Sequence, residues 1–192
     1  MPLMPAKSTP TNFRHADWVA LGVKSLRLEG ASALTVDHLC KRARRTKGSF
    51  YHHFKGIGEL TLALARHWAE AEGEAVAGTA HAGTTPKERL EAMLKLTPEA
   101  DHRLERGVRA LAVNDEGVAD IVRKSDDRRE LVMTTLLAGA YGIKGVEAHH
   151  FARLFHALHL AALMRSDEEV AAYADGPAAA LSAMLESNFP TS

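Results

Sequence analysis

Apolar residues recur along this chain of 192 residues with the spacing of an α-helix, and this periodicity constrains the fold more than any other feature. In segment after segment they occupy positions i, i+3, i+4 and i+7, and Pro or Gly separates one segment from the next. The alternation of apolar and polar residues that is typical of a half-buried strand does not occur. The sequence therefore predicts an all-α protein.

The expected helices are short near the N-terminus and longer after it. The first spans residues 12–29, and Gly30 follows it as a stop signal. Two short helices come next, and a long one follows the Gly56 and Gly58 pair and reaches about residue 77. Further helices are expected at residues 86–95, 99–113, 115–140, 146–165, 167–173 and 177–187.

Hydroxyl side chains stand where several of these helices begin. Thr35 and Thr46 precede the two short helices, and an N-cap threonine accepts a hydrogen bond from a backbone N–H that has no partner within the helix. Ser166 is followed three residues later by Glu169, which is the pattern of a capping box. These residues predict that helices begin directly after positions 35, 46 and 166.

Two short helices joined by a tight turn, with an amphipathic helix before them, form a helix-turn-helix. In the second short helix Phe50 and Phe54 stand one turn apart and can pack inward together. Lys47 then faces outward, where it can donate to guanine or phosphate, and Ser49 can both donate and accept. The predicted DNA-contacting residues are Thr35, Arg44, Arg45, Thr46, Lys47, Gly48, Ser49, Tyr51, His52, His53 and Lys55.

The distribution of charge supports this interpretation, although the net charge does not. The chain holds 24 basic and 24 acidic side chains, a balance that by itself argues against a nucleic-acid partner. The first 60 residues, however, hold 10 basic and four acidic side chains, whereas the remainder holds 14 basic and 20 acidic ones. A basic head on an acidic body is expected to dock a polyanion through the head.

Several classes of protein are disfavoured. No stretch of about twenty apolar residues could span a bilayer, and residues 1–10 lack the apolar core of a signal peptide, so a cytoplasmic location is expected. Cys40 is the single cysteine of the sequence, which excludes an intrachain disulfide. The sequence has neither a Gly-rich phosphate loop nor a nucleophile elbow, so we expect no enzyme, no cofactor and no metal site.

Residues 12–68 resemble the TetR family of bacterial transcriptional regulators. The resemblance lies in Leu34-Thr35-Val36, in Leu39-Cys40, in the run from Lys47 to Phe54 that contains GSFYHHF, and in Glu59-Leu60. With Trp18 and Trp68 at their positions, the GSFYHHF run resembles one subgroup of the family. Residues 105–112 and the pair Arg128-Arg129 are similar to what that subgroup carries in its regulatory domain.

Three prolines and small polar residues predict a flexible arm at residues 1–11. The resemblance implies a helix-turn-helix DNA-binding domain at 12–56 and a helical regulatory and dimerisation domain at 57–192. It also implies a homodimer, a palindromic operator and an unknown small-molecule effector of apolar or amphipathic character. The expected function is a ligand-responsive regulator, most often a repressor, that places two recognition helices in major grooves about 34 Å apart.

Three positions depart from the family pattern. Arg44 and Arg45 stand in the turn, where the family has Gly and a small apolar residue, and Ile57 replaces a common lysine. A left-handed Arg44 would cost about 1 kcal/mol or more, and a lost phosphate contact flattens the salt dependence by about one unit of slope. We expect the two arginines to supply the missing charge. The alternative is a dimeric small-molecule-binding or interaction protein that has lost specific DNA recognition.

The regulatory domain carries two further sets of expected functional residues. Large apolar side chains on its central helices are expected to line the ligand pocket: Trp68, Met93, Leu94, Leu111, Met133, Leu137 and Phe155. A helical face near the C-terminus is expected to meet a second copy of the chain: Phe151, Leu154, Leu158, His159, Ala162, Leu181 and Leu185. The alternative for the helix at 146–165 is burial within its own protomer.

The same helix contains His149, His150, His156 and His159. We expect interface or surface positions for them, because zinc wants three or four ligands and no cysteine is available here. A metal-dependent or pH-dependent response is the alternative.

Overall fold

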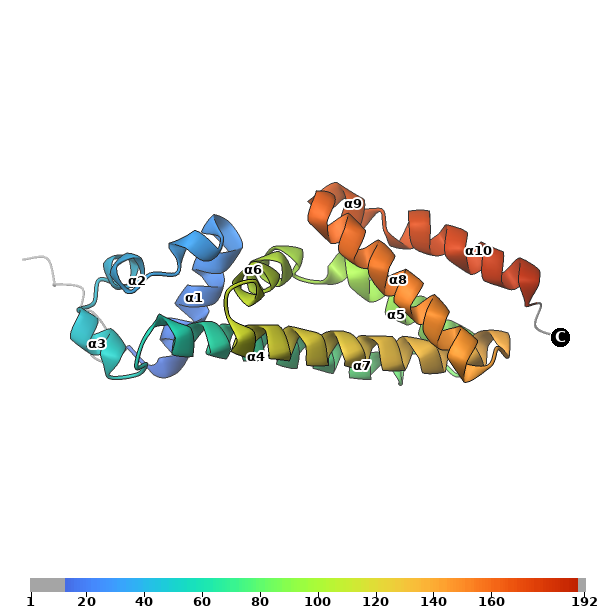
Figure 1. Ribbon diagram of the computed structural model, residues 1–192, viewed down its shortest axis with the longest axis horizontal. Coiled ribbons are helices and arrows are strands. Elements are labelled where there is room, and N and C mark those ends of the chain that lie inside the picture. Colours follow the sequence, from blue (N-terminus) through green and yellow to red (C-terminus); the bar gives the residue numbers. More distant parts are fainter. Residues whose placement is uncertain (1–12, 190–192) are drawn as a thin grey trace, which may run out of the picture.

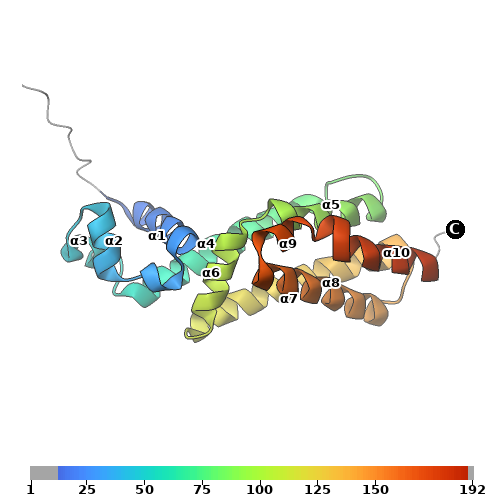
Figure 2. The ribbon, with the colours of Figure 1, turned by 90° about the horizontal axis from the view of Figure 1, so that it is seen from above.

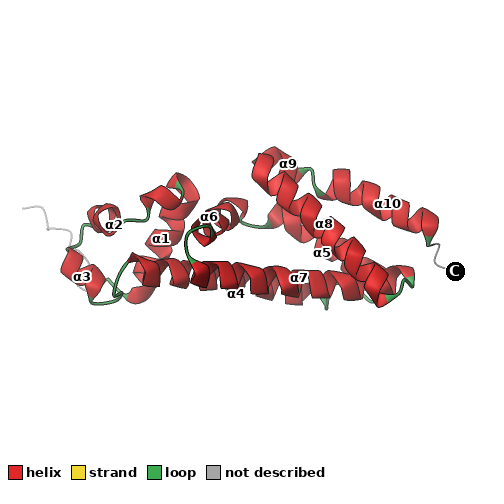
Figure 3. Cartoon of the chain, in the orientation of Figure 1, coloured by secondary structure: helices red, strands yellow, loops and turns green. Residues whose placement is uncertain are grey.

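The structure is a computed structural model that describes residues 13–189, except for the side chains of residues 97–99. The described chain is helical and contains no strand (Figure 3), which confirms the predicted all-α class. The predicted arm at residues 1–11 lies outside the described residues, as does residue 12.

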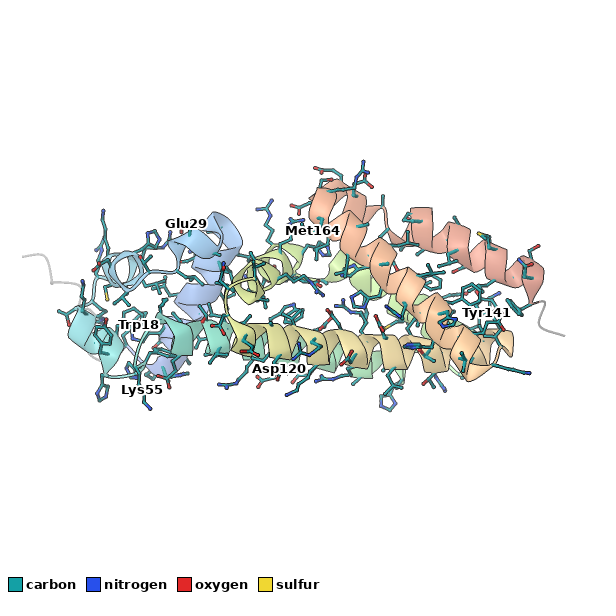
Figure 4. The ribbon with its side chains drawn as sticks, viewed as in Figure 1. Trp18, Glu29, Lys55, Asp120, Tyr141 and Met164 are labelled. Atoms are coloured by element: carbon teal, nitrogen blue, oxygen red, sulfur yellow. The ribbon has the colours of Figure 1, made fainter. Side chains whose placement is uncertain are left out.

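The first helices form a compact head at one end of an elongated molecule (Figure 1). Its elements are α1 (His15–Glu29), the 3₁₀ turn η1 (Ala31–Ala33), α2 (Val36–Ala43) and α3 (Lys47–Tyr51). Trp18 is completely buried among them (Figure 4), with ring edges from Phe13 and Phe50 against it at centroid distances of 4.8 and 5.2 Å.

The remaining helices form the body. They are α4 (Ile57–Thr79), α5 (Pro86–Glu99), α6 (His102–Ala112), α7 (Glu116–Tyr141), α8 (Gly145–Arg165), α9 (Asp167–Ala171), the π-helical segment η2 (Ala174–Ala178) and α10 (Ala179–Asn188). α4 and α7 run side by side along the length of the molecule, and α8 packs against α7. Seen from above, α6 lies between the head and the rest of the body (Figure 2).

The predicted helix starts are confirmed by their capping hydrogen bonds. Thr35 Oγ1 accepts from the backbone N–H of His38, and Thr46 Oγ1 accepts from that of Ser49, both at 3.2 Å. Ser166 Oγ likewise accepts from the backbone of Glu169 at 3.1 Å. Because each cap satisfies a donor that the first helical turn leaves over, local sequence defines where these helices begin.

The core of the head continues into the body. Leu60 and Leu64 of α4 and Leu104 and Val108 of α6 belong to the same buried cluster as Trp18 and Phe50. A second cluster fills the far end of the body around Leu137, Phe155 and Leu185. The head is therefore packed against α4 and α6, and a movement of either helix would act on it directly.

Candidate functional site

The turn of the helix-turn-helix is closed by Arg44 in the left-handed conformation, with φ 53° and ψ 47°. The backbone N–H of Arg45 reaches the carbonyl of Cys40 at 2.9 Å, and that of Arg44 reaches the carbonyl of Lys41 at 3.3 Å. These bonds satisfy carbonyls at the end of α2, as a glycine turn would. Arg44 thus takes the conformation that glycine usually supplies in this turn, and its side chain is exposed.

Arg45 is half-buried, and its guanidinium lies over the ring of Phe13 at 5.7 Å from the centroid. The ring of Phe13 in turn packs edge-on against Trp18. A charged residue is tolerated at this position because its planar guanidinium stacks on an aromatic ring. Arg45 is thus tied to the core of the head, and its predicted phosphate contact stays a prediction.

The second short helix, α3, exposes polar side chains on its outer face and packs against the head through aromatic side chains on its inner face. Phe50 and Phe54 are buried, with ring centroids 5.5 Å apart, as predicted. Lys47, Gly48 and His52 are exposed, and Tyr51 is 54% exposed, whereas Ser49 is half-buried. The outer surface of α3 therefore carries the donors that were expected to meet DNA.

Lys47 and Gly48 define the N-terminal end of this surface. Lys47 Nζ lies 2.6 Å from Asp37 Oδ1 on α2, and this hydrogen bond raises the pKa of Lys47 above its ordinary value. A Cβ on Gly48 would meet only Thr46 Oγ1, at 3.7 Å, so packing within the described chain does not demand glycine there. The absence of a side chain at Gly48 leaves the end of α3 open to a close external surface.

His53 and Ile57 contact other parts of the head, unlike the exposed residues of α3. His53 Nε2 lies 2.9 Å from the carbonyl oxygen of Phe13, so this ring nitrogen holds the segment that enters α1. Ile57 is half-buried and packs against the head core. Lys55 is exposed, and its backbone N–H donates to Glu59 Oε2 at 2.6 Å. The sequence missed the structural role of His53.

The body contains a cavity of about 370 Å³ between α4, α5, α6, α7 and α8. Five predicted pocket residues line it: Trp68, Met93, Leu94, Met133 and Phe155. The predictions for Leu111 and Leu137 are wrong. Leu111 packs against the head cluster, and Leu137, which is completely buried, belongs to the far core cluster, because a residue one helical turn beyond Met133 has passed the end of the cavity.

A cluster of charged side chains at the cavity was not foreseen from the sequence. Its centre is Glu105, which is 2% exposed. Glu105 Oε1 accepts from Arg109 Nε and Nη2 at 3.0 and 2.9 Å, and lies 3.4 Å from His159 Nε2. Burial alone would raise the pKa of Glu105, but the hydrogen bond and charge of His159, together with Arg109, lower it to about 2. Glu105 is therefore ionised at neutral pH.

The two arginines of the cluster each hold more than one carboxylate. Arg109 also donates to Asp126 at 2.9 and 2.6 Å, and its guanidinium lies over the ring of Trp68. Arg129 pairs with Glu72, and its Nη1 lies 3.6 Å from Glu105. Burial lowers the pKa of Arg129 to about 10, which leaves it charged at neutral pH.

The histidines of α8 divide between two faces. His149 and His150 are exposed, as expected, whereas His156 and His159 are buried at the cavity, so the expectation of interface or surface positions is wrong for these two. His156 lies between Asp126 and Glu130, with Nε2 and Nδ1 at 3.5 and 3.4 Å from their carboxylates. Burial outweighs the attraction of Asp126 and lowers the pKa of His156 to about 4. Among the described residues, no group of three or more His, Cys, Asp or Glu side chains is arranged to hold a metal ion.

The signal that could have identified the buried histidines is their spacing. His156 and His159 follow Ala152 and Phe155 at helical intervals, and all four lie on the face of α8 that is turned into the protomer. A histidine that shares a face with a buried aromatic residue needs a polar partner inside the protein. The sequence could not show that the partners come from α6 and α7.

The prediction of a dimer contact is wrong for four of the seven residues, because their side chains are turned into their own protomer. His159, Ala162, Leu181 and Leu185 are buried within their own protomer. Leu154 is 50% exposed, and Phe151 and Leu158 are half-buried against the far core cluster. The outer face of α8 is instead lined by Leu154, Ala157, Ala161 and Met164.

Among residues 13–189, no helix is both long enough and apolar enough to cross a membrane.

Comparisons with known proteins agree with the helix-turn-helix. The family model of the bacterial regulatory proteins of the tetR family matches residues 19–64. The transcriptional regulator AcuR of Cereibacter sphaeroides is 35% identical over 60 residues, which are 31% of this chain and 27% of that protein. The chain thus spans about a quarter of that relative's length in the match.

Solved structures share the fold over nearly the whole chain. A transcriptional regulator from Rhodococcus sp. RHA1 superposes with a TM-score of 0.74 at 19% identity, over 93% of this chain and 98% of that one. The regulatory protein TetR from Rhodobacter sphaeroides superposes with a TM-score of 0.70 at 20% identity, over 93% and 100%. Residues 19–64 therefore carry the helix-turn-helix of the tetR family of bacterial regulatory proteins, and the chain shares its fold with these solved transcriptional regulators.

Proposed function

We propose that this chain is a ligand-responsive repressor that binds a palindromic operator as a homodimer. The observation that carries the proposal is the outer surface of α3, where Lys47, Gly48 and Tyr51 are exposed on a helix anchored from below by Phe50 and Phe54. A helix held rigidly by its inner face can place its outer side chains against base edges and phosphates.

The charge of the head supports the same partner. Arg44 and Lys41 are exposed around the turn, and Lys55 is exposed beyond α3. These side chains surround the recognition helix, so they are placed to neutralise phosphates on either side of the groove. They replace the charge that the half-buried Ile57 does not supply.

Dimerisation is supported by the outer faces of α8 and α10. Leu154 and Met164 on α8 and Met184 on α10 are 50%, 77% and 62% exposed. Alanines separate these large residues, at positions 157, 161, 180 and 183, and all four are exposed. Met164 lies at the end of α8 nearest α9 (Figure 4). Two α8–α10 pairs with such faces can pack as a four-helix bundle.

The ion pair between Arg27 and Asp101 links the cavity to the head. Arg27 of α1 pairs with Asp101, and both residues line the cavity. Asp101 also caps α6, since its Oδ1 accepts from the backbone N–H of Leu104 at 3.1 Å. A ligand that displaced this pair would change how α1 sits on α6. Coupling of about 1–3 kcal/mol between the two sites would change operator affinity by about 5-fold to 150-fold.

The test is a titration of duplex DNA from the chain's own upstream region, against a scrambled duplex, at two salt concentrations. Specific binding about a thousandfold tighter than random binding is expected. Lys47→Ala and Tyr51→Phe should each weaken operator binding and leave dimerisation and the melting temperature nearly unchanged. Lys144→Ala, an exposed lysine at the start of α8, is the matched control and should bind normally. Equal affinity for both duplexes at both salts would instead support a dimeric ligand-binding protein without DNA recognition.

A further inference from the structure

The charges around the cavity do not balance. Within the described part of the chain, the cluster contains four carboxylates, Glu72, Glu105, Asp126 and Glu130, against two guanidinium groups, those of Arg109 and Arg129, and the imidazole of His159, which faces Glu105. The arginines engage three of the carboxylates. Glu130 is the fourth, and the group that faces its carboxylate among the described side chains is His156, with Nδ1 at 3.4 Å.

His156 does not neutralise Glu130. Burial holds the pKa of this histidine near 4, so the imidazole is uncharged at neutral pH and carries one N–H. It stands between two carboxylates, Asp126 and Glu130, and one of them therefore faces a lone pair. Both distances, 3.5 and 3.4 Å, are at the outer limit of a hydrogen bond. A half-buried carboxylate in this position is stabilised if a cation arrives.

The walls beside Glu130 suit the rest of such a ligand. Met133 lies one turn further along α7, and Phe155, Met93 and Leu94 also line the cavity. Aromatic faces attract organic cations, and apolar walls take up an alkyl or aryl group. The volume of about 370 Å³ falls in the range that encloses a small organic molecule.

We propose that the cavity binds a monovalent organic cation with an apolar tail, whose ammonium group lies at the Glu130 carboxylate and whose tail lies against Met93, Leu94, Met133 and Phe155. This inference rests on the proposed ligand-responsive function and assigns the chemical class of its ligand. Glu130 is then a specificity-determining residue, because it favours a cation over a neutral or anionic molecule of the same shape.

Calorimetric titration of the full chain with three probes of equal tail length tests the proposal. The probes are octyltrimethylammonium, 1-octanol and octanoate, each below the concentration at which it self-associates. The cation is expected to bind at least about tenfold tighter than the alcohol, which corresponds to one desolvated charge pair. Equal or tighter binding of octanol or octanoate overturns the proposal, and this comparison needs no variant.

Glu130→Gln keeps the shape of the side chain and removes its charge. It should weaken binding of the cation about tenfold or more and leave binding of octanol within about twofold. Glu147→Gln, an exposed carboxylate on α8, is the matched control and should change neither. Unchanged cation binding by a folded Glu130→Gln protein overturns the assignment of Glu130, and Glu130→Ala, which also removes the charge, serves in its place if the glutamine variant does not fold.

A parallel operator titration with the cation at saturation separates this proposal from the function on which it rests. Tight cation binding without any effect on operator affinity would leave the cavity chemistry standing and reject ligand-responsive repression. If the chain binds the operator specifically and with the expected salt dependence but prefers octanol to the cation, the proposed regulator stands and the cation site is rejected.

Discussion

Arg44 shows what a single residue decides in this head. It ends α2 in a conformation with positive φ, and within the described part of the chain no other non-glycine residue has a positive φ. A side chain in this conformation costs about 1 kcal/mol relative to glycine. The turn nevertheless forms, because two backbone hydrogen bonds satisfy the end of α2. The strain is compatible with a functional use of the exposed guanidinium at this position.

Arg44→Gly should therefore separate stability from DNA binding. Removing the strain is expected to raise the melting temperature by about 2–4 °C, while loss of one phosphate contact lowers the salt slope of operator binding by about one unit. Arg44→Ala removes the same charge but keeps a side chain at positive φ, so it should show the weaker salt slope without the thermal gain. A glycine variant that melts below the alanine variant would contradict the strain argument.

At the scale of helices, the contact between α1 and α6 depends on Gly107. A Cβ at this position would lie 2.5 Å from Leu26 Cγ, nearer than atoms can approach. α6 can therefore press directly against α1, close to the Arg27–Asp101 pair. This close packing joins the head to the helix that borders the cavity.

Gly107→Ala is expected to destabilise the protein by about 1–3 kcal/mol through overpacking, as measured by denaturant unfolding. Leu26→Ala opens space at the same contact, so the double variant should be more stable than the sum of the single changes predicts. Gly78→Ala on α4 is the matched control, because a Cβ there meets nothing within 4 Å. Additive effects at positions 26 and 107 would count against the described contact.

The whole molecule places the recognition surface at one end and the cavity in the body, with α4 and α6 between them (Figures 1 and 2). Leu154 and Met184 remain exposed although they are large and apolar. Exposed apolar faces on adjacent helices are typical of association surfaces. A second copy that covers them would give the assembly two recognition helices, as a palindromic site requires.

Leu154→Glu combined with Met184→Glu should convert the proposed dimer into a monomer of 20.8 kDa in light-scattering chromatography, because buried carboxylates without partners oppose association. Operator binding should fall with it, since a monomer offers one recognition helix. Leu131→Glu changes another exposed leucine, on α7, and is expected to leave the dimer intact. A wild-type chain that is itself monomeric would reject the dimer.

The sequence by itself determined the helices, their starts and the helix-turn-helix. Thr35, Thr46 and Ser166 act on backbone groups three residues away, and Phe50 and Phe54 are one turn apart, so the interactions that define these features lie within a few residues. Local periodicity and local chemistry were sufficient there.

The tertiary structure alone decided which helical faces meet and which charges are buried. Glu105, Arg129 and His159 lie on three different helices, and the Glu105 carboxylate is favourable in the interior because His159 and the arginines compensate its loss of water. Likewise, the rotation of α8 about its axis turned His159 and Ala162 inward and left Leu154 outside. Periodicity identifies a helical face but not the partner of that face, since the partner comes from a distant part of the chain.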